Sequence, residues 1–171
     1  MVNKTHIAKN KTNSKKLTNS KNLFKIFHQN IRGLKSKVEE LTNDFLLHYP
    51  HIMCLTEHHL KDYEILNLPI DHFKLGSKYC RREFKNGGVC IFVHKELEFS
   101  PISLEKYCKE KDIEVCAIQI NITHKELFII SVYRSPSGNF TNFLRNLDSI
   151  LNTWYNNKTI FVICGDTNII T

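Results

Sequence analysis

The sequence predicts a layered α/β domain with mixed β-sheets and helices on the outside. Apolar runs of strand length dominate the chain, and two amphipathic helical segments lie among them. The order is strand–helix–strand, then several antiparallel strands, then helix–strand, which is typical of mixed sheets covered by helices. The length of 171 residues suits one domain with a substantial core.

In the first third of the chain, we predict a strand over Leu23–His28 that runs into the polar segment 29–33. A helix follows to about His48, with Ser36 as its N-cap and apolar residues at helical spacing. The apolar run His51–Thr56 predicts a buried strand. Residues 60–70 carry weaker signals and predict a loop or a short helical turn.

The middle of the chain is rich in strand signals. Residues 71–76 and 89–93 read as strands on either side of a polar, basic loop over 77–86. Residues 114–121 and 127–132 are two strand-like runs that face each other across a Thr-His-Lys turn, which predicts an antiparallel hairpin.

The last part returns to a helix and a strand. A helix begins at Phe140, with large apolar residues along one side as far as Trp154. The apolar run Thr159–Cys164 then predicts a buried strand, which is followed by Gly165-Asp166-Thr167-Asn168.

Residues 1–21 differ in composition from the rest of the chain. They contain six lysines and no acidic residue, whereas the whole chain has a formal net charge of +7. Because this segment has few large apolar residues, we expect a disordered basic tail and a folded domain over 22–171. The tail fits a nuclear address or a loose contact with phosphates, and equally well a solvated leader without a role.

Composition also bears on the compartment. No apolar run approaches the length that spans a bilayer, and the start has no apolar signal region. The six cysteines form neither Cys-x-x-Cys pairs nor zinc-type Cys/His spacings, and four of them lie inside apolar runs (Cys54, Cys90, Cys116 and Cys164). We therefore expect a protein of the nucleus or cytoplasm with no disulfide framework, no structural zinc and no membrane association.

Polar clusters follow four of the predicted strands: Asn30, Glu57, Tyr133 with Arg134, and Asp166 with Asn168. The carboxyl ends of strands are where α/β proteins build their sites. Carboxylate and amide oxygens suit Mg²⁺, and an aspartate can take a proton from an attacking water. Together these residues favour metal-assisted hydrolysis of a phosphate ester, although each alone is equally well explained as a strand-end or turn residue.

Five motifs in a fixed order carry a family resemblance: Gln29-Asn30-Ile31-Arg32-Gly33-Leu34, Leu55-Thr56-Glu57, Gly87-Gly88-Val89, Val132-Tyr133-Arg134-Ser135-Pro136 and Gly165-Asp166-Thr167-Asn168. Over residues 23–168 the chain resembles the endonuclease/exonuclease/phosphatase superfamily, which includes apurinic endonucleases and pancreatic-type deoxyribonucleases. Within it, the chain is most similar to the endonuclease domains of non-LTR retrotransposons, which are associated with reverse transcriptase.

The resemblance implies a four-layer α/β sandwich with two mixed β-sheets flanked by helices. It places Asn30 and Glu57 on the metal side, with Glu57 as the principal ligand of Mg²⁺ or, alternatively, Mn²⁺. Tyr133 would lie near the scissile phosphate, Asp166 would align or deprotonate the nucleophilic water, and Asn168 would hold the phosphate. No small-molecule cofactor is expected.

We further predict DNA as the partner of a monomeric protein. The predicted DNA contacts are Arg32, Arg134 and the loop cations Lys78, Arg81, Arg82 and Lys85. The same loop contains Tyr79 and Phe84, and a mixture of cations and aromatic rings is typical of surfaces that bind single strands. A solvated connection between two strands explains this loop about as well.

The leading hypothesis is thus a Mg²⁺-dependent DNA endonuclease of retrotransposon type, leaving a 3′-hydroxyl that primes reverse transcription. The resemblance implies an aspartate–histidine pair after Asn168, and the 171 residues end before such a pair. We therefore expect a fold incomplete at the C-terminus and impaired hydrolysis. The alternatives are a non-catalytic remnant that binds nucleic acid or protein, and a phosphatase or sphingomyelinase relative.

Overall fold

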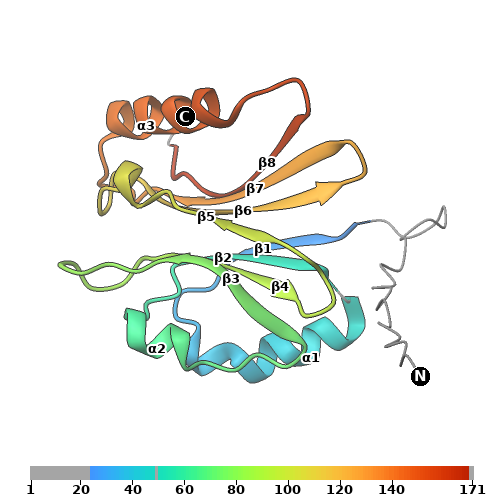
Figure 1. Cartoon of the computed structure of the whole chain (residues 1–171). Coiled ribbons are helices and arrows are strands. Elements are labelled where there is room, and N and C mark those ends of the chain that lie inside the picture. Colours follow the sequence, from blue (N-terminus) through green and yellow to red (C-terminus); the bar gives the residue numbers. More distant parts are fainter. Residues whose placement is uncertain (1–23, 49, 170–171) are drawn as a thin grey trace, which may run out of the picture.

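The computed structural model describes residues 24–48 and 50–169. Two four-stranded sheets pack face to face; α1 and α2 cover the outer face of one sheet, and α3 covers the outer face of the other (Figure 1). This arrangement is the predicted four-layer α/β sandwich with mixed sheets. The predicted basic tail, residues 1–21, lies outside the described residues.

The first sheet has the strand order β1-β2-β4-β3. Its strands are β1 (Ile26–Asn30), β2 (Ile52–Thr56), β3 (Phe73–Tyr79) and β4 (Val89–His94). β1 and β2 run parallel, and β4 pairs antiparallel with both β2 and β3. The helical elements on this side are the 3₁₀ turn η1 (Lys35–Lys37), α1 (Val38–His48) and α2 (Asp62–Leu66).

The second sheet has the strand order β5-β6-β7-β8. Its strands are β5 (Ser100–Ile102), β6 (Glu114–Ile122), β7 (Lys125–Tyr133) and β8 (Thr159–Asp166). β6 and β7 form the predicted hairpin, and β8 returns parallel to β7 after α3 (Phe140–Trp154). A 3₁₀ turn, η2 (Glu105–Tyr107), follows β5.

The main core lies between the two sheets. Ile52 and Ile91 from the first sheet and Ile118 and Ile129 from the second are all fully buried there. Because these strands are covered on both faces, they read in the sequence as continuous apolar runs instead of alternating ones. Separate apolar clusters bury the inner faces of α1 and α3.

The predicted helices and strands are present, with ends shifted by a few residues. Ser36, predicted as an N-cap, lies inside η1 instead, because the chain turns helically from Lys35. The sequence gives no sign of β5, which is short and contains Pro101, a residue that sheets tolerate at their edges. Among the described helices, none is both long and apolar enough to cross a membrane.

Candidate active site

Four strands bring their carboxyl ends to one end of the sandwich. β1 and β2 run parallel with Asn30 beside Thr56, and β7 and β8 run parallel with Tyr133 beside Asp166. The two pairs belong to opposite sheets, and β1 lies against β8 across the interface. Residues that follow these strands therefore face one another between the sheets.

Asn30 is the centre of the resulting cluster. Its side-chain Nδ2 donates one hydrogen bond to Oε1 of Glu57 and another to Oδ2 of Asp166, each over 2.8 Å. The two carboxylates come from different sheets, yet each lies one hydrogen bond from the same nitrogen. The structure thus brings together Asn30, Glu57 and Asp166, as the sequence predicts.

The backbone after β2 turns sharply to present Glu57. Glu57 and His59 both have left-handed backbone conformations, with φ of 55° and 62°, which side-chain-bearing residues rarely adopt. The turn is held by hydrogen bonds from Gly33 N to Glu57 O (2.8 Å) and from His59 N to Gly87 O (2.9 Å). Such strained residues persist only where their surroundings fix them, and they gather at functional sites.

The Glu57 carboxylate is stabilised in its charged form. Partial burial acts to raise its pKa, but hydrogen bonds from Asn30, Tyr133 and His59 outweigh burial, so that the pKa lies below its ordinary value. His59 Nε2 lies 3.4 Å from Oε2 of Glu57. An ionised, half-buried carboxylate of this kind is well suited to bind a cation.

The Tyr133 side chain, in contrast to Glu57, is stabilised in its protonated, uncharged form. Burial, the nearby negative charge of Glu57 and the hydrogen bond to Glu57 raise the pKa of the Tyr133 phenol to about 12. The hydroxyl therefore stays protonated at neutral pH and acts as a hydrogen-bond donor.

Asp166 ends β8, and Asn168 follows two residues later. Asn168 has a left-handed backbone, with φ of 47°, and its N–H lies 3.2 Å from Oδ1 of Asp166. Its side-chain Nδ2 donates to the carbonyl of Arg134 over 2.7 Å. Both carboxylate oxygens of Asp166 therefore accept hydrogen bonds, one from Asn30 and one from Asn168, which fixes the carboxylate orientation.

Arg134 is placed differently from the prediction. It is only 6% exposed, and its guanidinium donates to the carbonyls of Thr167, Gly138 and Asn168. The predicted DNA contact is therefore replaced by a structural one. Arg134 ties the loop after β7 to the Asp166–Asn168 turn, because its donors are all directed at backbone oxygens.

The predicted basic loop also divides into buried and exposed cations. Arg81 is 7% exposed, and its Nε donates over 2.7 Å to the fully buried Glu114, so this guanidinium is not presented at the surface. Lys78 lies within β3 and forms an ion pair with Asp62. The remaining predicted contacts, Arg32, Arg82 and Lys85, are exposed, and Arg82 pairs with Glu105.

The two histidines after Glu57 have separate roles. His58 is fully buried: Nδ1 accepts from Leu60 N (3.0 Å), so Nε2 carries the proton and donates to Tyr79 O (3.0 Å). Burial lowers the His58 pKa to about 4. His59 instead supports the Glu57 carboxylate, and its only signal in the sequence is its position two residues after Glu57.

A hard divalent cation fits this cluster. Among the residues that the structure describes, no three His, Cys, Asp or Glu side chains form a complete metal cage. Mg²⁺, however, commonly uses one or two carboxylates and keeps several waters. The cluster offers the ionised Glu57 together with Asn30 Oδ1, a buried acceptor without a hydrogen-bond partner among the described residues.

Known structures share this fold. The endonuclease domain of the telomere-specific non-LTR retrotransposon TRAS1 superposes with a TM-score of 0.63 at 13% identity, covering 87% of this chain and 61% of that one. D. rerio TDP2 in complex with a single-strand DNA product superposes with a TM-score of 0.61 at 16% identity, covering 86% of this chain and 62% of that one. The mannosyl-6-phosphatase Bt3783 of Bacteroides thetaiotaomicron superposes with a TM-score of 0.63 at 10% identity, covering 87% of this chain and 67% of that one.

This chain thus spans about three fifths of the length of the first two of these proteins. A sequence search of the curated proteins finds no match. Residues 27–170, in contrast, match the model of the Endonuclease/Exonuclease/phosphatase family, a stretch that includes every residue of the cluster around Asn30. The chain belongs to the Endonuclease/Exonuclease/phosphatase family.

Proposed function

We propose that this chain is the catalytic part of a monomeric, Mg²⁺-dependent DNA endonuclease of retrotransposon type, with Mn²⁺ as an alternative ion. One observation carries the proposal: Asn30 donates to the carboxylates of Glu57 and Asp166 at once. That contact holds a candidate metal ligand and a candidate general base one hydrogen bond from the same amide nitrogen. Such proximity supports hydrolysis of a phosphodiester by an activated water.

Each residue of the cluster has a distinct role in the proposed reaction. Glu57 and the Oδ1 of Asn30 would hold the ion, which when bound polarises a phosphoryl oxygen. Asp166, fixed through both of its oxygens, accepts the proton of the attacking water. The protonated Tyr133 hydroxyl donates to a phosphate oxygen, and Asn168, from the same sheet, orients the phosphate.

DNA is favoured as the substrate by the kinds of protein that share the fold. Two of the structural neighbours are a retrotransposon endonuclease domain and a protein bound to a single-strand DNA product. Because a phosphatase superposes with a comparable TM-score, a phosphate monoester is the second candidate substrate. Both substrates use the same cluster, so the choice between them rests on the assay.

The test is nicking of supercoiled plasmid DNA with Mg²⁺ or Mn²⁺ by the 171-residue chain, with a sugar phosphate as the competing substrate. We expect nicks with 3′-hydroxyl ends that a DNA polymerase extends, and loss of nicking with EDTA. Glu57→Gln and Asp166→Asn should each reduce the rate by about a hundredfold or more, whereas the exposed helix variant Asp148→Asn should not. Equal nicking by all variants, or hydrolysis of the sugar phosphate alone, contradicts the proposal.

A further inference from the structure

The connection between β3 and β4, residues 80–88, lies at the functional end of the molecule. It projects beyond the sheets at the left of Figure 1, the end at which β1, β7 and β8 finish. Its base touches the candidate site twice: Gly87 O accepts from His59 N (2.9 Å), and the Arg81 guanidinium lies 5.8 Å from the centre of the Tyr133 ring. The base of this connection is therefore in contact with residues of the candidate site.

This connection is held by two buried or half-buried acids. The carboxylate of Glu110 accepts hydrogen bonds from the backbone N–H groups of three successive residues, among them Glu83 (3.1 Å) and Phe84 (2.9 Å). Glu114 binds both ends of the segment, through Arg81 Nε (2.7 Å) and Gly88 N (2.6 Å). The loop therefore has a fixed shape, and little ordering entropy remains to be lost when it binds a partner.

The loop presents an aromatic ring and a cation. The Phe84 side chain is 41% exposed, although a ring of this size is normally buried. The Lys111 ammonium lies 3.5 Å from the centre of that ring. Lys111 is itself anchored, because its N–H donates to Glu114 (3.1 Å) and its carbonyl accepts from Ser135 (2.8 Å), two residues after Tyr133. None of the ion pairs among the described residues involves Lys111 or the neighbouring Lys85.

We infer that Phe84 and Lys111 form a docking platform for a DNA strand entering the site, with an unpaired base stacked on the Phe84 ring and a phosphate bound by the Lys111 ammonium. An exposed ring stacks on any base, and the adjacent ammonium supplies the charge that a phosphate requires. This inference rests on the proposed function for its choice of DNA. The platform would add a contact with the substrate outside the cluster around Asn30.

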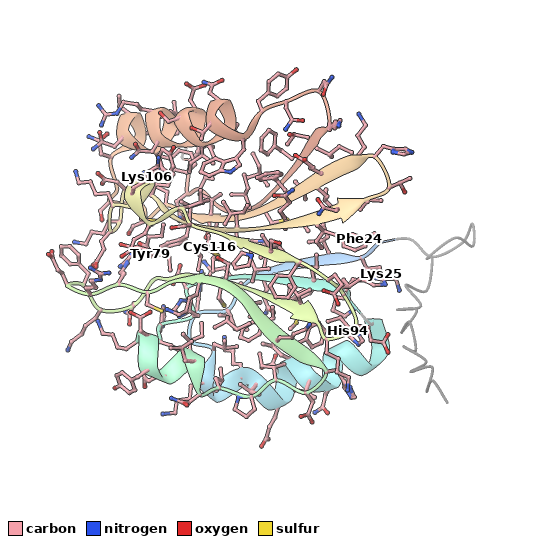
Figure 2. The ribbon with its side chains drawn as sticks, viewed as in Figure 1. Phe24, Lys25, Tyr79, His94, Lys106 and Cys116 are labelled. Atoms are coloured by element: carbon pink, nitrogen blue, oxygen red, sulfur yellow. The ribbon has the colours of Figure 1, made fainter. Side chains whose placement is uncertain are left out.

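The test measures binding without cleavage. Fluorescence anisotropy with a short labelled single-stranded oligonucleotide in EDTA compares the chain with Phe84→Ala, Phe84→Leu and Phe84→Trp. We expect Ala and Leu to weaken binding by about tenfold, since a stacked base contributes this much, and Trp to keep it. The control is Phe24→Ala, a ring of similar exposure (37%) that Figure 2 places at the opposite end of the molecule from Tyr79.

A parallel pair of variants tests the cation. In a plot of the logarithm of the binding constant against the logarithm of the salt concentration, Lys111→Ala should reduce the steepness of the slope by about one. Lys74→Ala is the matched control, because Lys74 also lies over a phenylalanine ring, that of Phe99 (5.5 Å), but on the amino end of β3. Circular dichroism verifies that each variant is folded.

The outcomes separate the two proposals. Binding that is unchanged in Phe84→Ala, or reduced equally in Phe24→Ala, overturns the platform whether or not the chain nicks DNA. Binding that depends on Phe84 without any nicking supports the platform and counts against the catalytic proposal. A chain that fails to bind the oligonucleotide at all contradicts the platform, and the plasmid-nicking assay then decides the catalytic proposal by itself.

Discussion

Nδ2 of Asn30 lies 2.8 Å from Oδ2 of Asp166, although the two residues are 136 positions apart in the sequence. Asn30 ends the edge strand of one sheet, and Asp166 ends the edge strand of the other. The contact exists because both strands run in the same direction across the interface between the sheets. The same amide nitrogen also binds Glu57, so that one side chain links both acids of the candidate site.

Replacing Asn30 with alanine is expected to raise the pKa of Glu57. The hydrogen bond from Asn30 is the largest of the contributions that lower this pKa against the effect of burial, and the variant removes it. Without the bridging amide, the charges of Glu57 and Asp166 also face each other directly. Carbon-13 NMR titration of the Glu57 carboxyl measures the shift; an unchanged pKa would show that the Asn30 contact does not form in solution.

The buried pair of Arg81 and Glu114 is expected to behave as a unit. Arg81→Met leaves the Glu114 charge buried without its partner, and such losses typically cost about 3–5 kcal/mol in the free energy of unfolding. The double variant Arg81→Met/Glu114→Leu removes both charges and should recover a large part of this loss. Urea denaturation of the two single variants and the double variant gives the coupling. Additive effects would contradict the pairing.

Gly87 and Gly88 are expected to tolerate alanine poorly. Both have positive φ, 75° and 87°, and a Cβ atom would lie 2.2 Å from Arg81 Nε at Gly87 and 2.4 Å from His58 Nε2 at Gly88. Gly33 is a matched control, since its φ is 103° but its Cβ would meet nothing closer than His59 Nδ1 at 3.6 Å. The free energy of unfolding should therefore fall further in Gly87→Ala and Gly88→Ala than in Gly33→Ala, by about 1–3 kcal/mol for the overlap. Equal losses at the three positions would mean that backbone strain alone decides.

Sequence reasoning predicts most of the strands and the cluster around Asn30, although the strand ends are shifted by a few residues. It succeeds here because polar residues after apolar runs are visible in the chain itself. It fails where the direction of a side chain decides. Arg81 and Arg134 look like DNA contacts in the sequence, yet both point into the protein, because Glu114 and backbone carbonyls lie within their reach. Such partners are distant in the sequence and become apparent only once the sheets are packed.

His58 is another residue whose surroundings become apparent only in the packed fold, and its burial leads to a pH prediction. The buried ring is held neutral with a pKa of about 4, against an ordinary value of 6.5 in the unfolded chain. Between pH 6.5 and about pH 4, His58 binds more protons in the unfolded state than in the folded state. The contribution of His58 to the free energy of unfolding is therefore fully present above pH 6.5 and is lost as the pH drops towards 4. His58→Asn should flatten this part of the pH profile.

The control for the pH profile is His124→Asn, because His124 is exposed in the turn between β6 and β7. Its removal should leave the slope of the free energy of unfolding against pH unchanged. A slope that disappears in the His124 variant and persists in the His58 variant would contradict the neutral, buried state of His58.

The measurement that tests the central claim most directly is a Mn²⁺ titration of the labelled chain followed by NMR. Paramagnetic broadening is expected first at the amides of Asn30, Glu57 and Asp166. Mg²⁺ should reverse it by competition, and Glu57→Gln should abolish it. Broadening that begins at other acidic residues, or that is unchanged in Glu57→Gln, would contradict a divalent metal site at the junction of the two sheets.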